Sequence, residues 1–188
     1  MADYVLLMDA DMILKVDGFN KEELKTATVF YILQYNGILQ YQNIRIVKNE
    51  GYQYKGVTHE CLSVPDNSIG KRLKSLFICD IGDGGSKKDK FDRDIRLLLE
   101  GIKEEPNNSR YYFYLANSYF HNKNINEAIE YYKKRIDFGG WKEEVWYSHY
   151  RIGLCHEVQG NMEKALESWL NAYEIIPARL ENIYKIIN

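Results

Sequence analysis

Apolar and polar residues are arranged in two different ways along this chain of 188 residues. Up to residue 81, short apolar runs alternate with Gly, Asn and Asp, which is typical of strands separated by turns. Asn36-Gly37 is a strong signal for a hairpin turn. The pattern predicts a short helix at Lys21–Thr26 and strands at Asp3–Met8, Thr28–Leu33, Leu39–Val47 and Gln53–Val57.

From residue 91 onward, apolar residues recur every three or four positions, as they do on one face of a helix. Pro106-Asn107-Asn108 and Gly139-Gly140 interrupt this pattern and mark connections. The pattern predicts helices at Phe91–Glu105, Arg110–Asn122, Asn126–Asp137, Glu143–Gln159, Met162–Ile175 and Leu180–Ile187.

The helical part contains an internal repeat with an offset of 37 residues, as from Leu115 to Ile152. Small residues recur where paired helices would touch, and an aromatic residue recurs near the end of each second helix. This pattern resembles the tetratricopeptide repeat, whose period is 34 residues, and we expect a longer turn at Asp137–Lys142 to absorb the difference. A generic helical bundle is the alternative. The matched pairs are Leu115 with Ile152, Ala128 with Ala165, Tyr132 with Trp169 and Gly140 with Pro177.

The two patterns meet in a stretch rich in Gly, Ser and charge, which predicts a linker at residues 82–90. We therefore expect an α+β chain with an α/β-type region at residues 1–81 and an all-α helical array at residues 91–188. Hydrophobic residues make up 45% of the chain and charged residues 28%, which favours packed cores over disorder.

Charge and cysteine content narrow the classes of function. A net charge of −2 with no basic patch argues against nucleic-acid binding. Cys61, Cys79 and Cys155 are odd in number and far apart, so buried free thiols in a reducing compartment are expected rather than disulfides or a zinc site. The absence of a long apolar run and of a signal segment predicts no membrane span and a cytoplasmic location.

Two carboxylates, Asp9 and Asp11, directly follow the first predicted strand. Ligands of open α/β sheets bind at the carboxyl ends of strands, and two nearby carboxylates can share a hard cation such as Mg²⁺ or Mn²⁺. Such a cation would neutralise a diphosphate. The alternative is an ordinary surface turn or helix cap. His149 and His156, seven residues apart on one predicted helix, are expected to pack or to line a groove rather than bind metal.

The segment Asp3–Leu14 resembles the Asp-x-Asp strand end of family 2 glycosyltransferases, which have the GT-A fold. Some members of that family also carry tetratricopeptide repeats, and Tyr54–Glu60 is similar to their aromatic-x-Gly-x-x-His-Glu stretch. The resemblance implies transfer of a sugar from a nucleotide-sugar to an acceptor hydroxyl. It implies Asp11, Asp9 and His59 as metal ligands and Glu60 as the catalytic general base. It also implies that Arg45, Gly56 and Lys87 help to bind the donor, Lys87 from a glycine-rich loop that is otherwise a solvated linker.

Two functions stay open at this stage. The chain resembles only the C-terminal half of a GT-A domain, so we expect it to be a fragment or a split relative whose half-sheet exposes a parallel edge. Its partners would then be a nucleotide-sugar and a glycan or protein acceptor. Alternatively, the chain is a non-catalytic interaction module whose repeats bind a protein partner or a second copy, with a remnant transferase region.

Overall fold

The computed structural model describes residues 2–82 and 89–187 and divides the chain into two compact units. The β unit consists of Met1–Gly56 and Glu60–Ser86, and the helical unit consists of Val57–His59 and Lys87–Asn188. A strand-rich first part is therefore followed by a helical array, which confirms the expected α+β class.

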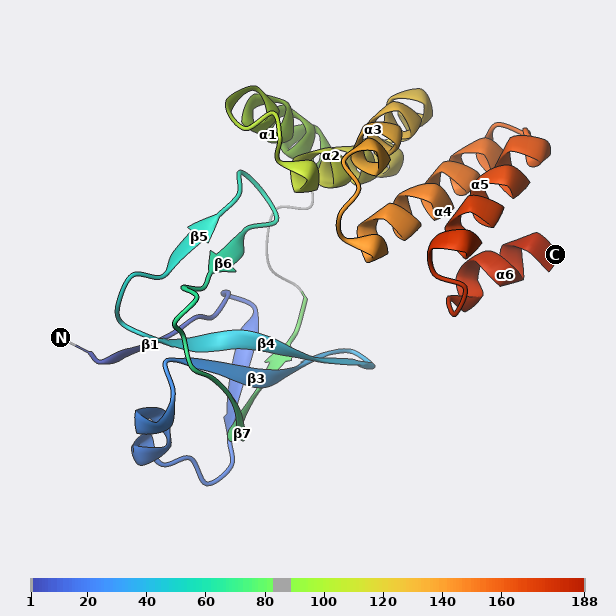
Figure 1. The fold of residues 1–188 in the computed structure, drawn as a ribbon. Coiled ribbons are helices and arrows are strands. Elements are labelled where there is room, and N and C mark those ends of the chain that lie inside the picture. The colour runs from blue at the N-terminus through green and yellow to red at the C-terminus, as the bar shows by residue number, and fades with distance from the viewer. Residues whose placement is uncertain (1, 83–88, 188) are drawn as a thin grey trace. The chain divides into compact units, whose positions relative to one another are not determined.

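The β unit contains a five-stranded sheet built from β1 Tyr4–Leu6, β2 Met12–Val16, β3 Val29–Asn36, β4 Leu39–Lys48 and β7 Gly70–Asp80. Its order is β1-β4-β3-β7-β2 (Figure 1). Only the central pair, β3 and β7, runs parallel, and the other neighbours are antiparallel. Both edge strands are antiparallel to their neighbours, so the expectation of an exposed parallel edge is wrong.

The core of the β unit lies on the face of the sheet that the helix η1, Lys21–Thr26, helps to cover. Buried apolar side chains from the central strands fill it, and Leu24 of η1 packs against them. Asn20 begins η1 with a capping box, because its side chain accepts the Glu22 N–H while Glu23 accepts the Asn20 N–H. The buried residues of this core are Ala27, Phe30, Ile32, Ile46, Leu73, Leu76 and Ile78.

A β-bulge in β4 turns one charged side chain into the interior of the β unit. Phe30 of β3 lies opposite Ile46, and the next residue, Tyr31, lies opposite Ile44. Arg45 is the extra residue in between, and only 7% of it is exposed. Because a bulge changes the direction of a side chain relative to the regular pleat, Arg45 can lie among buried residues although its neighbour Ile46 is buried too.

The described residues of the helical unit form six α-helices (Figure 1). Consecutive helices pack against one another, and each connection between them has three or four residues. All six predicted helices are confirmed, each to within one residue at either end. They are α1 Lys90–Glu104, α2 Ser109–His121, α3 Ile125–Asp137, α4 Lys142–Val158, α5 Met162–Ile175 and α6 Leu180–Ile187.

Matched residues of the two repeats occupy matched positions in the helical unit. Ala128 and Ala165 are both fully buried, as are their aromatic partners Tyr132 and Trp169. Gly153 in α4 lies so close to Trp169 that a Cβ atom would come within 2.2 Å of the indole Nε1. The small residues therefore allow an aromatic side chain to fill the space between paired helices, as expected for this repeat.

The longer period of the repeat comes from a helix and not from a turn. The connections before α2 and before α4 both have four residues, but α4 has 17 residues and α2 has 13. The additional residues form one further turn at the start of α4. The expectation that the turn at Asp137–Lys142 absorbs the difference is therefore wrong.

This additional turn brings a carboxylate into the interior. Glu144 in α4 accepts a hydrogen bond of 2.8 Å from Nε of Arg135 in α3, and both side chains are at least 95% buried. Arg135 also donates to the carbonyl oxygen of Gly139, at 2.8 Å. This ion pair fixes the corner between α3 and α4, because both of its charges are buried and each needs the other.

A two-stranded ribbon, β5 Gln53–Lys55 and β6 Cys61–Ser63, completes the β unit. The three residues Val57–His59 between these strands belong to the helical unit. A Cβ atom added to Gly101 of α1 would lie 3.0 Å from a side-chain carbon of Val57, so Val57 packs closely against α1.

The three cysteines are free thiols, and Cys155 is buried. Cys61 is exposed, so the expectation that all three are buried is wrong. Across residues 2–82 and 89–187, none of the helices has the length and apolar character that crossing a membrane would require.

Candidate functional site

The sequence-predicted residue Asp9 lies close to the side chain that the bulge turns inward. The Asp9 carboxylate is 65% exposed and forms an ion pair of 3.4 Å with Nη1 of Arg45. Arg45 also donates from Nε and Nη2 to Oε1 of the buried Gln34, at 3.2 and 3.0 Å, and from Nη1 to the carbonyl oxygen of Leu7, at 3.4 Å. A buried guanidinium therefore fixes the position of an exposed carboxylate.

Asp11 follows Asp9 in a tight turn between β1 and β2. The Met12 N–H donates to the Asp9 carbonyl oxygen at 3.1 Å, and the Ile81 N–H donates to the Asp11 carbonyl oxygen at 3.0 Å. Asp11 is half-buried. The two predicted carboxylates thus lie in one short segment that is tied to both edges of the sheet.

The other predicted site residues are divided between the two units. Gly56 and the exposed Glu60 belong to the β unit, whereas His59 belongs to the helical unit. His59 stacks on Tyr114 of α2 with ring centroids 4.1 Å apart and rings 6° from parallel. Lys87 lies outside the described residues. Within the described part of the chain, no group of three or more His, Cys, Asp or Glu side chains is close enough together to hold a metal ion.

A groove that the sequence did not reveal lies along the first helices of successive pairs. Its volume is about 410 Å³. The lining comes from α2, from α4 and from the connections before α4 and α6, and five of its nine residues are aromatic. We call it the aromatic groove; it is lined by Arg110, Phe113, Tyr114, Trp141, Glu143, Glu144, Trp146, Tyr147 and Arg179.

Ring contacts hold the walls of the aromatic groove. Phe113 lies 5.7 Å from Tyr147, measured between ring centroids, and 5.4 Å from Tyr114. Trp146 stacks on Tyr150 at 5.6 Å, and its indole N–H donates to Oδ1 of the buried Asn182 at 3.2 Å. These contacts preorganise the groove, because few side-chain rotations stay free.

The charges in the aromatic groove balance. Arg110 donates to the Tyr114 hydroxyl at 2.8 Å and pairs with Glu144 at 3.5 Å. Arg179 pairs with Glu143 and lies over the Trp146 ring, 4.8 Å from its centroid. The lining therefore contains two arginines and two glutamates, and Glu144 is shared between Arg110 and the buried Arg135.

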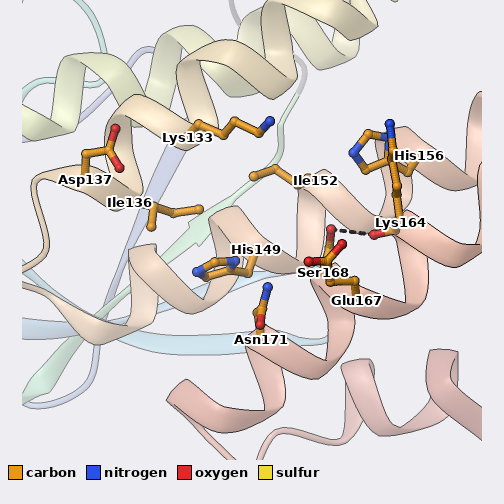
Figure 2. A pocket seen from close by; sticks show the side chains of 10 residues that line it. All are labelled: Lys133, Ile136, Asp137, His149, Ile152, His156, Lys164, Glu167, Ser168 and Asn171. Carbon is orange, nitrogen blue, oxygen red and sulfur yellow. Dashed lines mark hydrogen bonds between the residues drawn. The ribbon is translucent and has the colours of Figure 1, made fainter.

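A second, more polar pocket of about 460 Å³ lies between α3, α4 and α5 (Figure 2). His149 and His156 of α4 both line it, as expected from their spacing. Burial lowers the pKa of His149, so its imidazole is neutral at pH 7. Lys133 and Lys164 contribute positive charge, and Asp137 and Glu167 offset it.

Comparison with known proteins supports the repeat assignment. The tetratricopeptide repeat family matches residues 97–130, which span the end of α1, all of α2 and the start of α3. No curated protein sequence matches the chain. The match covers part of the helical unit, so the resemblance of residues 1–81 to a glycosyltransferase stays a prediction.

Solved structures resemble the helical array. The N-terminal domain of stress-induced protein-1 (STI-1) from C. elegans has a TM-score of 0.51 and 18% identity, covering 54% of this chain and 82% of that one. The first TPR of Spaghetti (RPAP3), bound to an HSP90 peptide, has a TM-score of 0.48 and 19% identity, with 54% and 78% covered. The first TPR domain of human RPAP3 has a TM-score of 0.47 and 19% identity, with 54% and 77% covered. At 18% identity, the similarity to the STI-1 domain concerns the fold alone.

Proposed function

We propose that the helical unit is a protein-interaction module that binds an extended peptide segment in the aromatic groove. The composition of the groove carries this proposal: of its nine lining residues, five are aromatic and two are arginine. Trp, Tyr and Arg are the residues that most often dominate the energy of protein interfaces. Lys and Asp, which interfaces disfavour, are absent from this lining, whereas Glu, which is disfavoured too, contributes two residues.

The electrostatics of the groove favour an uncharged peptide with an apolar anchor. Arg110 and Arg179 already have carboxylate partners in Glu144 and Glu143, so an acidic ligand would have to compete with them. Aromatic walls instead offer apolar area together with the polar tips of Trp and Tyr, which can pair with the peptide backbone. We therefore expect an aromatic or aliphatic side chain to enter the groove beside Trp141, which is 58% exposed.

A selection from a random peptide library on the full chain tests the proposal. Selected peptides should share an apolar anchor and should change the fluorescence of the tryptophans, all of which lie in the helical unit. Trp141→Ala should weaken their binding about tenfold or more, because a truncated interface aromatic commonly costs that much. Tyr54→Ala is the matched control, since Tyr54 is similarly exposed, at 54%, but belongs to the β unit.

The proposal fails if the library yields no binding peptide, or if Trp141→Ala and Tyr54→Ala bind the selected peptides equally well. Peptides selected for multiple acidic residues would contradict the inference about an uncharged ligand. Circular dichroism of both variants separates a loss of binding from a loss of fold.

A second candidate function is the sugar transfer that the resemblance of residues 1–81 implies. It is favoured by the exposed Asp9 carboxylate, which the buried Arg45 holds in place. Mg²⁺ is often held by one or two carboxylates together with substrate phosphates, so Asp9 and Asp11 are sufficient protein ligands for it without His59. The cation would neutralise the diphosphate of a nucleotide-sugar. Glu60 would accept the proton of the acceptor hydroxyl, and Gly56, Arg45 and Lys87 would contact the donor.

Calorimetric titration of UDP or GDP with Mn²⁺ into the chain tests this second candidate. Binding that needs the metal and is lost in Asp11→Ala would support a donor site in the β unit. Binding of equal strength in the chain and in Asp11→Ala, or no binding at all, would contradict a donor site built on these carboxylates. Asp17→Ala, which removes an exposed carboxylate of the same unit beyond β2, is the matched control.

A further inference from the structure

The last two helices each carry a row of exposed apolar side chains. Leucine, isoleucine and tyrosine on them are between 40% and 74% exposed. In Figure 1 these helices close the helical unit at its C-terminal end. We call this surface the terminal face; it consists of Leu166, Leu170 and Tyr173 of α5 and Leu180, Tyr184 and Ile187 of α6.

Helical spacing places these side chains on one face of each helix. On α5 they follow at intervals of four and three residues, and on α6 at the same intervals. The opposite side of α6 is occupied, because Asn182 binds Trp146 and Lys185 binds Glu157 of α4. The terminal face therefore points away from the packed interior of the helical unit.

Two of the three positions one repeat earlier that match the α5 residues of the terminal face are covered. At the offset of 37 residues, Leu166 matches Ile129 and Tyr173 matches Ile136. Leu170 matches Lys133, a charged residue that is exposed. Ile129 is 9% exposed and packs in a core cluster with Ile152 of α4, and Ile136 packs against the same cluster. The succeeding helix covers this face of α3. On α5, however, α6 is only eight residues long and leaves most of the corresponding face open.

The exposed area is large enough for a specific interface. With about 200 Å² for each large side chain, the exposed fractions of the six residues leave roughly 700 Å² of mostly apolar surface. A standard interface buries about 800 Å² on each partner, and exposed apolar patches of several hundred Å² usually mark interaction sites.

We propose that the terminal face binds the same face of a second copy of this chain, so that two helical arrays meet through α5 and α6. The apolar surface at the two ends of the array determines whether two copies meet head-to-tail or about a two-fold axis. Among the described residues of α1, α2 and α3, no large apolar side chain is as exposed as those of the terminal face, so the first end offers less apolar surface for head-to-tail contact. A two-fold contact, in which each copy supplies the same patch, is closed and ends at two copies.

Light scattering coupled to size-exclusion chromatography of the full chain tests this proposal over a roughly hundredfold range of concentration. The wild-type mass should rise from one chain to two and then stay there. Tyr184→Lys and Leu170→Lys, one on each helix, should each raise the dissociation constant of the dimer at least about tenfold. Ile38→Lys, which changes an almost fully exposed apolar residue of the β unit to the same charged residue, should leave it unchanged.

Three results would overturn the proposal: a wild-type chain that stays monomeric over the whole range, a mass that grows beyond two copies, or a Tyr184→Lys variant that dimerises as the wild type does. The first would mean that the terminal face is covered by a different partner, and the second that the contact is head-to-tail. Because these residues lie outside the aromatic groove, peptide binding by the lysine variants reports separately on the proposed interaction module.

Discussion

The contact between Gly153 and Trp169 allows a sharp test of the repeat packing. Replacing Gly153 by alanine adds one methyl group to α4. Its carbon would lie 2.2 Å from Nε1 and 2.4 Å from Cδ1 of Trp169, which is far inside van der Waals contact. Trp169 is 1% exposed, so its ring has no free space to move into. The ring would also lose its hydrogen bond of 3.3 Å to the carbonyl oxygen of Tyr150.

Two opposing effects set the size of the change in stability. Alanine is a better helix former than glycine by about 1 kcal/mol. Forcing a methyl group into a packed core costs roughly 1–3 kcal/mol or more, and the displaced indole loses about 1 kcal/mol of hydrogen bonding. The clash wins, so we expect Gly153→Ala to lower the free energy of unfolding of the helical unit by about 1–3 kcal/mol.

Urea unfolding followed by tryptophan fluorescence measures this change in the helical unit, because Trp141, Trp146 and Trp169 all lie there. A smaller ring should relieve the clash, so Trp169→Phe in the Gly153→Ala background should restore stability by about 1 kcal/mol relative to additivity. An unchanged or raised urea midpoint in Gly153→Ala would refute the reasoning, as would strictly additive effects in the double variant.

Three further predictions concern buried titratable groups. Glu144→Gln removes the partner of the buried Arg135 and should cost about 3–5 kcal/mol in urea unfolding, whereas Glu143→Gln, at a half-exposed pair, should cost less than about 1 kcal/mol. Burial raises the pKa of the Cys155 thiol to about 12, so at pH 8 this thiol should resist alkylation until the chain unfolds. As the pH rises above about 9, the thiol loses its proton in the unfolded state first, and the free energy of unfolding should therefore fall. Burial lowers the pKa of His149, so as the pH falls below about 6.5 the unfolded state binds a proton before the folded state does, and the free energy of unfolding falls. This dependence of the free energy of unfolding on pH should be weaker in His149→Gln. A steep, unchanged slope in that variant, rapid alkylation of native Cys155, or equal costs at Glu143 and Glu144 would contradict the respective predictions.

The helical unit could be predicted almost completely from the sequence. Local signals specify it: apolar residues at helical spacing, interruptions at Pro106 and Gly139, and small residues at Ala128 and Ala165 that return at one offset. The helix predicted at Glu143–Gln159 already contains the extra turn of α4, but the longer period of the repeat was assigned to the connection before it. The buried ion pair that Glu144 forms with Arg135 of α3 ties this turn to the preceding helix, and local sequence does not reveal such a long-range contact.

The β unit was less predictable, because long-range pairing determines it. β7 lies inside the sheet next to β3, yet its sequence contains three basic residues before Leu76, so its alternation is hidden. The bulge at Arg45 depends on how β4 pairs with β3, which local sequence does not encode. The antiparallel edges of the sheet likewise depend on strand order.

The candidate sites differ in the same way. Asp9 and Arg45 could be chosen from the sequence, and the structure adds their ion pair and the support from Gln34. The aromatic groove was missed because its residues are spread over α2, α4 and two connections, and each aromatic alone reads as core. The exposed Trp141 after Gly139-Gly140 was the one signal that could have indicated it.

The most direct test of the interaction module is an NMR titration of the ¹⁵N-labelled chain with a selected peptide, observing the three tryptophan indole N–H signals. The exposed Trp141 and the groove wall residue Trp146 should shift on binding, while Trp169, which lies outside the groove, should stay unchanged. Shifts confined to Trp169 and to residues of the pocket around His149 would contradict the account and would place the peptide between α3, α4 and α5 instead.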